Sequence, residues 1–179
     1  YSFADKIIVQ DSKKAESLSD HVAADKIAVI GSPKVDRLRK LEKRKNEIID
    51  LEIPENWKNK IEGKKVFLFN ISITGILKNS KYALDKIRYV LSEFEVREDV
   101  ILLWRPHPLI EATLKTMRPD LYIEYIEMKE AFIRKDKGIF DESGDAGVAA
   151  VLADAYLGES TSSLVHYFGV LGKPILYID

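Results

Sequence analysis

Short apolar segments alternate with amphipathic segments through the last two thirds of the chain. The apolar segments have the length of buried strands, and the segments between them carry apolar residues at helical spacing. The expected strands are 66–70, 100–104, 138–140, 155–157 and 175–178, and the expected helices are 83–94, 109–117, 146–153 and 163–170. Residues 124–135 also favour a helix, since Tyr125, Met128, Ala131 and Phe132 recur at helical spacing. This alternation predicts an α/β fold with a Rossmann-like open parallel sheet.

The first 50 residues follow a weaker pattern. Residues 6–9 and 26–30 are short strand candidates, 12–22 is a polar helix or loop, and 37–50 suits a solvated connecting helix. We therefore expect residues 1–50 to be the end of one domain with a connecting helix, 51–63 a linker, and 64–179 a second domain. Because the chain opens at Tyr1 and ends in a strand-like run, we expect it to be cut from a longer protein.

Composition narrows the function classes. The 179 residues carry a net charge of -1, so no global field favours nucleic acid or an anionic membrane. Cysteine is absent, which excludes disulfides and thiolate chemistry and is compatible with the cytoplasm. No apolar run approaches the roughly 20 residues that span a bilayer. Metal-ligand spacing, a dinucleotide fingerprint, a P-loop and a nucleophile elbow are also missing, so we expect no metal or cofactor.

Open parallel sheets bind ligands outside the carboxyl ends of their strands. This rule selects four loops, at 70–75, 105–108, 141–145 and 158–163. The polar, glycine-containing and histidine-containing segments of the second domain fall in these loops. We therefore expect the functional site at this edge of the sheet.

The loop after the strand at 100–104 reads Arg105-Pro106-His107-Pro108. The prolines restrict the backbone on either side of the imidazole. The Arg105 guanidinium matches phosphate oxygens, and His107 can donate a hydrogen bond or help neutralise a leaving phosphate. The alternative is that His107 caps the following helix or bonds a nearby carbonyl.

The other three loops offer carboxylates, hydroxyls and amides. Backbone N–H groups at the start of the helix at 163–170 would attract anions, and simple capping by Ser162 or Thr161 is the alternative. Ordinary helix capping is the favoured explanation of the carboxylates in the 141–145 loop; if they bind a ligand, they suit ribose hydroxyls or an exocyclic amine. The candidate binding residues are Asn70, Ser72, Thr74, Asp141, Ser143, Asp145, Glu159, Ser160, Thr161, Ser162 and Ser163.

Several motifs together resemble the CDP-glycerol glycerophosphotransferase family. They are GSPKVD at 31–36, WRPHPL at 104–109, ADAYLGE at 153–159, the serine pair at 162–163 and GKP at 172–174. Their order and spacing match the family from about residue 26 onward. The resemblance implies a GT-B architecture of two Rossmann-like domains. This chain would be the C-terminal half, which holds the nucleotide donor, plus a tail of the N-terminal half.

The resemblance also implies an activity. The family transfers glycerol phosphate from CDP-glycerol to a teichoic-acid-like or lipid-linked acceptor and releases CMP, on the cytoplasmic side of the membrane. By motif, His107 and Arg105 would be the catalytic residues that contact the donor phosphates. Ser162 and Ser163 would bind the pyrophosphate, and the 141–145 loop would lie near cytidine. Any peripheral membrane contact would come from parts outside this chain.

Two departures from the family pattern qualify this implication. Glu159 stands where many family members have Asp. The His-Gly-Thr motif that carries the family's general base does not occur in the sequence, so the chain alone should bind donor without turning it over. Two alternatives stay open: a GT-B glycosyltransferase that uses a nucleotide sugar, and a non-catalytic nucleotide-binding module.

Overall fold

The computed structural model describes residues 3–179. The chain divides into two compact units, one ending at Lys40 and the other running Leu41–Asp179. The division falls inside the segment that was expected to be a connecting helix. Among the described residues, no helix combines the length and the apolar content that crossing a membrane requires.

The first unit contains a two-stranded parallel sheet. Strands β1 (Ile7–Val9) and β2 (Ile27–Val29) pair from Ile7 opposite Ile27 to Val9 opposite Val29. Helix α1 (Ser12–Glu16) and the short 3₁₀ helix η1 (Ala24–Lys26) connect them. Both predicted strands are confirmed, and the helix occupies only the first part of the 12–22 segment.

The prediction of a single helix at 37–50 is wrong, because two helices cover this region. Helix α2 (Pro33–Lys43) ends before Arg44, and α3 (Lys45–Leu51) begins after it. Arg44 leaves the helical conformation with φ −105° and ψ 15°, and its guanidinium contacts Glu47 at 2.7 Å and Glu52 at 3.1 Å. The expected linker at 51–63 also contains a helix, α4 (Glu55–Ile61), which begins directly after Pro54.

The second unit is built on a five-stranded parallel sheet in the order β5-β4-β3-β6-β7. Its strands are β3 (Lys65–Asn70), β4 (Val100–Trp104), β5 (Ile139–Phe140), β6 (Ala155–Gly158) and β7 (Ile175–Tyr177). The chain runs from β3 to β5 on one side, and then returns to place β6 and β7 on the other. The predicted Rossmann-like α/β fold is confirmed, and its topological switch point lies between β3 and β6.

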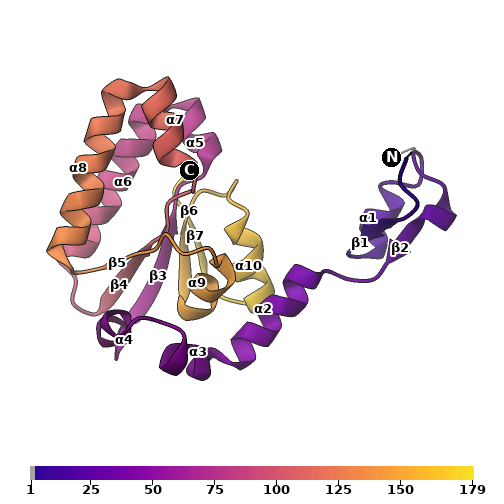
Figure 1. Cartoon of the computed structure of the whole chain (residues 1–179), viewed down its shortest axis with the longest axis horizontal. Coiled ribbons are helices and arrows are strands. Elements are labelled where there is room, and N and C mark those ends of the chain that lie inside the picture. The colour runs from indigo at the N-terminus through magenta and orange to yellow at the C-terminus, as the bar shows by residue number, and fades with distance from the viewer. Residues whose placement is uncertain (1–2) are drawn as a thin grey trace. The chain divides into compact units, whose positions relative to one another are not determined.

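Helices cover both faces of this sheet (Figure 1). On one side α6 contacts β4 and α8 contacts β5, and on the other α9 and α10 contact β3, β6 and β7. The helices are α5 (Ile73–Lys78), α6 (Ser80–Glu95), α7 (Ile110–Met117), α8 (Pro119–Lys135), α9 (Ala146–Leu152) and α10 (Leu164–Leu171). The four predicted helices are confirmed, and so is helix at 124–135, as part of α8.

Helix α5 corrects the predicted loop at 70–75. Ser72 accepts a hydrogen bond from the Gly75 N–H at 3.1 Å, which caps the helix, and Ile76 is completely buried. The β-branched residues and glycine of this segment disfavour a helix on their own. Burial of Ile76 and the cap therefore outweigh the local preference.

The core next to the carboxyl end of β4 is organised around Trp104, the last residue of that strand. Its ring makes edge-on contacts with Tyr125, Phe132 and Phe140 at centroid distances of 6.1, 5.4 and 5.1 Å. All five residues of β4 are buried. Trp104 thus fixes Tyr125 of α8 next to the loop that follows β4.

Candidate functional site

The loops after β3 and β6 meet at the switch point through Asn70. Its amide nitrogen donates to the Arg105 carbonyl at 2.8 Å, and its amide oxygen accepts from the Ser162 hydroxyl at 2.8 Å. Asn70 is 5% exposed. An added Cβ at Gly158, the residue opposite Asn70 in the sheet, would lie 2.2 Å from the Asn70 carbonyl oxygen. Glycine is therefore required for the two strands to end so close together.

Glu159 is the second buried connection between these loops. Its carboxylate accepts hydrogen bonds from both the backbone N–H and the hydroxyl of Ser72, and it forms an ion pair with Lys86 at 3.0 Å. Lys86 also donates to the Ile178 carbonyl at 2.9 Å. An added Cβ at Gly75 would lie 2.2 Å from a Glu159 oxygen, so α5 approaches this carboxylate closely. Internal partners thus surround the Glu159 side chain.

The loop after β6 carries several hydroxyl side chains, whose burial and hydrogen bonding differ from residue to residue. Ser162 is buried and its hydroxyl is used internally, since it donates to Asn70 and accepts from the Leu164 N–H at 3.3 Å. Thr161 lies 3.0 Å from the Ser72 hydroxyl. Ser163, the residue before α10, is exposed and makes no side-chain cap bond. Its hydroxyl is consequently open to a ligand.

Arg105 and Asp141 form a buried ion pair at 2.5 Å, with side chains 10% and 0% exposed. The guanidinium also donates to the Ser143 hydroxyl at 3.2 Å and to the Ser143 carbonyl at 2.7 Å. Asp141 in turn accepts from the Ser143 N–H at 2.8 Å. The ion pair and these hydrogen bonds link the loop after β4 to the loop after β5, and they are the main contacts of the Arg105 side chain.

His107 is partly exposed on the same loop. Its Nδ1 accepts a hydrogen bond from the Leu109 N–H at 3.2 Å, so the capping alternative is realised in part. Burial lowers the pKa of His107 below its ordinary value, which favours the neutral ring. A neutral ring that accepts at Nδ1 carries its proton on Nε2, where it can donate to a ligand.

Two neighbouring cavities share residues 105–108. The first, which we call the β3–β6 cavity, measures about 330 Å³ and lies along the switch point. Its lining includes eight predicted residues: Asn70, Ser72, Thr74, Arg105, His107, Thr161, Ser162 and Ser163. The predicted residues of three separate loops therefore surround one space.

The second cavity, the α7–α8 cavity, measures about 490 Å³. It lies between the loops after β4 and β5 and the helices α7 and α8. Four predicted residues line it, namely Arg105, His107, Asp141 and Ser143. It also contains Glu142, which was predicted only as one of the carboxylates of the 141–145 loop, and Glu111 and Tyr125, which were not predicted as site residues. Tyr125 was recognised only as an apolar helix position, and a tyrosine at a buried helical position is the signal that could have drawn attention to it.

Three predicted residues, Asp145, Glu159 and Ser160, line neither cavity. Asp145 caps α9 by accepting from the Gly147 N–H at 2.9 Å. The Ser160 N–H donates to Asp179 at 2.9 Å. Contact of these residues with a ligand stays a prediction. Within residues 3–179, no group of three or more His, Asp or Glu side chains could hold a metal ion.

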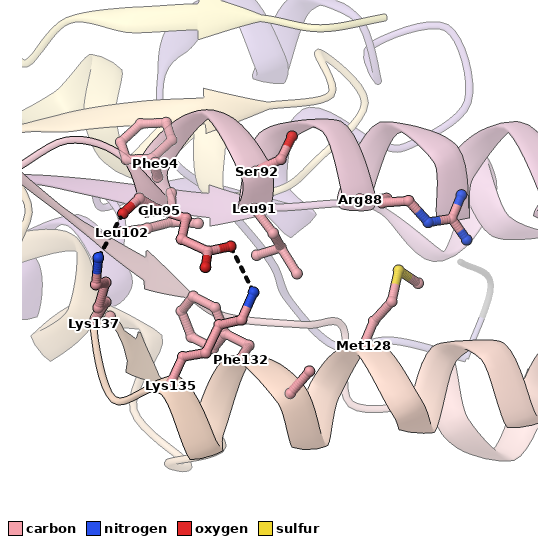
Figure 2. A pocket seen from close by; sticks show the side chains of 12 residues that line it. Arg88, Leu91, Ser92, Phe94, Glu95, Leu102, Met128, Phe132, Lys135 and Lys137 are labelled. Carbon is pink, nitrogen blue, oxygen red and sulfur yellow. Dashed lines mark hydrogen bonds and ion pairs between the residues drawn. The ribbon is translucent and has the colours of Figure 1, made fainter.

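A third space, the α6–α8 cleft, lies between α6 and α8 (Figure 2). It measures about 200 Å³, and Leu91, Phe94 and Met128 contribute apolar walls. Lys135 forms an ion pair with Glu95 at 2.6 Å at its rim (Figure 2). None of the predicted site residues lines this cleft. It is therefore separate from the candidate site.

No protein-family model matches the chain, and no curated protein matches it. Solved structures of the wall teichoic acid polymerase TagF do match. A His-to-Asn variant soaked with CDPG aligns over 97% of this chain with a TM-score of 0.58 at 21% identity. TagF itself aligns over 97% with a TM-score of 0.56 at 17% identity. The chain spans 38% of each of these TagF chains, and the likeness establishes a shared fold.

Proposed function

We propose that the second unit is the donor-binding, C-terminal half of a GT-B glycerophosphotransferase. The donor is CDP-glycerol, the acceptor is a teichoic-acid-like or other cell-surface polymer, and the released product is CMP. The observation that carries the proposal is the β3–β6 cavity, where eight residues from three loops gather at the switch point of the sheet. The fold shared with TagF, which has been soaked with CDPG, supports the choice of donor.

The β3–β6 cavity would hold the two phosphates of the donor. His107 would donate from Nε2, and the free hydroxyl of Ser163 would donate from the start of α10. Arg105 would add positive charge from behind the loop while keeping its ion pair with Asp141. Asn70, Ser162 and Glu159 would position these groups, because their own polar atoms bind one another and the neighbouring loops.

The chemistry of the complete protein would be displacement at the β-phosphorus. An acceptor hydroxyl oxygen forms a bond to that phosphorus, and the bond from phosphorus to the bridging oxygen breaks, so that CMP leaves with the electron pair. Positive charge and hydrogen-bond donors near His107 would stabilise the leaving phosphate. The acceptor proton would pass to a base outside these 179 residues, since no His-Gly-Thr motif occurs in them. The reaction would take place at the cytoplasmic side of the membrane.

Calorimetric titration of the chain with CDP, UDP and GDP tests this proposal. We expect CDP to bind most tightly. We expect His107→Ala and Ser163→Ala each to weaken CDP binding about tenfold or more, since each removes a hydrogen bond to a charged phosphate. His166→Ala is the matched control, because His166 is exposed on α10 and lines neither cavity.

The outcomes separate the alternatives. A preference for UDP or GDP would support a nucleotide-sugar glycosyltransferase, and absence of nucleotide binding would support a non-catalytic module. If CDP binds and both site variants keep the affinity of the unmodified chain, the assignment of the phosphate site is wrong.

A further inference from the structure

A chain of hydrogen bonds leads from the buried Glu159 carboxylate through Ser72 to Thr161, and both hydroxyls line the β3–β6 cavity. The phosphate contacts proposed above use neither of them. The two hydroxyl oxygens lie 3.0 Å apart, a distance at which one of them donates to the other. Each hydroxyl has a single proton, so the direction of this bond decides what Thr161 can offer to a ligand.

The position of the Ser72 proton follows from Glu159. One carboxylate oxygen of Glu159 accepts from the Ser72 N–H at 3.0 Å and contacts the Ser72 hydroxyl. The other oxygen is paired with Lys86 at 3.0 Å, and an ionised carboxylate only accepts hydrogen bonds. A Ser72 lone pair turned towards the carboxylate would be repelled by it. The Ser72 hydroxyl therefore donates to Glu159.

The position of the Thr161 proton follows from Ser72. The Ser72 oxygen already accepts from the Gly75 N–H at 3.1 Å, so its second lone pair is satisfied when Thr161 donates to it. Ser72 is only 6% exposed, and turning the Thr161 proton away would leave that lone pair buried without a partner. Thr161 consequently presents lone pairs to the cavity, where it can accept a hydrogen bond but not donate one to phosphate.

We propose that Glu159 is a positioning residue that fixes Thr161 as a hydrogen-bond acceptor, so that the β3–β6 cavity recognises an alcohol hydroxyl of the ligand beside its phosphates. The inference rests on the proposed function, in which His107 and Ser163 bind the phosphates in this same cavity. In CDP-glycerol, hydroxyls flank the phosphates on both sides, on the glycerol and on the ribose.

The length of the Glu159 side chain makes this arrangement possible. The carboxylate reaches from the loop after β6 to Ser72, the residue that caps α5, and to Lys86 on α6. Gly75 leaves room for it, because an added Cβ there would lie 2.2 Å from a Glu159 oxygen. Aspartate is one methylene shorter, and from the same backbone position its carboxylate would lie farther from Ser72.

Calorimetric titration of the full chain with inorganic pyrophosphate, CDP and CDP-glycerol tests the assignment of Thr161. Thr161→Val removes the hydroxyl and keeps the shape of the side chain. We expect unchanged affinity for pyrophosphate and about fivefold weaker binding of the ligand whose hydroxyl Thr161 accepts, the loss of one neutral hydrogen bond. If Thr161 donates to phosphate instead, pyrophosphate affinity falls about tenfold or more, and the proposal is overturned.

The choice of ligands identifies the hydroxyl. A loss for CDP-glycerol without a loss for CDP assigns the glycerol. A loss shared by CDP and CDP-glycerol, but absent for the dideoxy analogue of CDP that lacks both ribose hydroxyls, assigns the ribose. Unchanged affinity of Thr161→Val for every ligand would refute the role of Thr161.

Glu159→Asp tests the positioning role, because it keeps the negative charge and shortens the side chain. The affinity ratio between the hydroxyl-bearing ligand and pyrophosphate should fall, by less than in Thr161→Val, since the hydroxyl remains but its orientation is no longer fixed. A merely structural role would weaken the binding of all ligands by one common factor. An unchanged ratio in a folded variant would therefore refute the positioning role of Glu159.

Thr116→Val is the matched control, since Thr116 is exposed on α7 and lines neither cavity. It should bind every ligand with unchanged affinity. If His107→Ala weakens CDP binding while Thr161→Val binds every ligand like the unmodified chain, this inference is refuted and the proposed function stands. If the unmodified chain binds neither CDP nor CDP-glycerol, the proposed function fails and this inference fails with it.

Discussion

The two cavities at the carboxyl edge of the sheet share a wall but treat their buried polar groups differently. Around the β3–β6 cavity, Asn70, Ser162 and Glu159 are bonded to other parts of the protein. In the α7–α8 cavity, Tyr125 has a buried hydroxyl that nothing in the described chain satisfies. The first arrangement holds the loops together, whereas in the second the Tyr125 hydroxyl is left without a partner. Buried polar groups at this edge of the sheet thus separate into those that bond within the protein and one, the Tyr125 hydroxyl, that does not.

The largest expected effect on stability comes from replacing Asp141. Asp141→Ala leaves the Arg105 guanidinium buried without its carboxylate, and we expect a loss of about 3–5 kcal/mol in the free energy of unfolding. Urea denaturation measures it. Asp120→Ala removes the carboxylate of an exposed pair with Arg118 and should leave stability unchanged. Equal effects of the two substitutions would mean that the Arg105 pair does not hold the loops.

Glu159 should give the next largest effect. Glu159→Ala removes the only carboxylate paired with Lys86 among the described residues and one hydrogen-bond partner of the Ser72 hydroxyl, so we expect a loss of about 2–3 kcal/mol in the free energy of unfolding, measured by urea denaturation. CDP affinity should fall as well, because Ser72 loses the carboxylate that holds its hydroxyl next to Thr161. Lys81→Ala, at an exposed ion pair on α6, is the control. A folded Glu159 variant with unchanged CDP affinity would show that the loops keep their places without this carboxylate.

The smallest expected effect is a pH dependence at His107. Burial lowers the pKa of His107 in the unliganded protein, and a bound phosphate would raise it. Binding would then take up a proton, so CDP affinity should rise a few-fold as pH falls from about 7 to about 5. The terminal phosphate of CDP itself takes up a proton at about pH 6, and the loss of negative charge opposes this rise in affinity. His107→Gln keeps the second effect and loses the first, so the difference between the two calorimetric profiles isolates the imidazole. Parallel profiles would argue against contact between His107 and phosphate.

The sequence was sufficient to predict the sheet because its strands are apolar runs bounded by polar or proline-containing turns. Strand β4 is an example, with five buried residues followed by Arg105 and Pro106. The gathering of loops was also predictable, since parallel strands end at the same edge of a sheet. Helix α5 was not predictable, because it depends on burial of Ile76 and on a cap from Ser72.

Local sequence patterns could not predict which polar groups have a hydrogen-bond partner in the folded chain and which do not. Glu159 and Ser72 are 87 residues apart, and Ser162 and Asn70 are 92 apart. Only the folded chain brings them into contact, so their polar atoms looked available in the sequence. Tyr125 shows the reverse case. Helical spacing indicated only that it belongs to a helix, and the absence of a partner for its hydroxyl depends on α7, α8 and the loop after β5 together.

The most direct test of nucleotide binding at this edge is an NMR titration of the isotope-labelled chain with CDP. The account predicts amide shift changes concentrated in residues 105–109, 141–145 and 159–164, with little change along the α6–α8 cleft at Leu91, Phe94 and Met128. Shift changes concentrated in that cleft, or no shift changes at millimolar CDP, would contradict it.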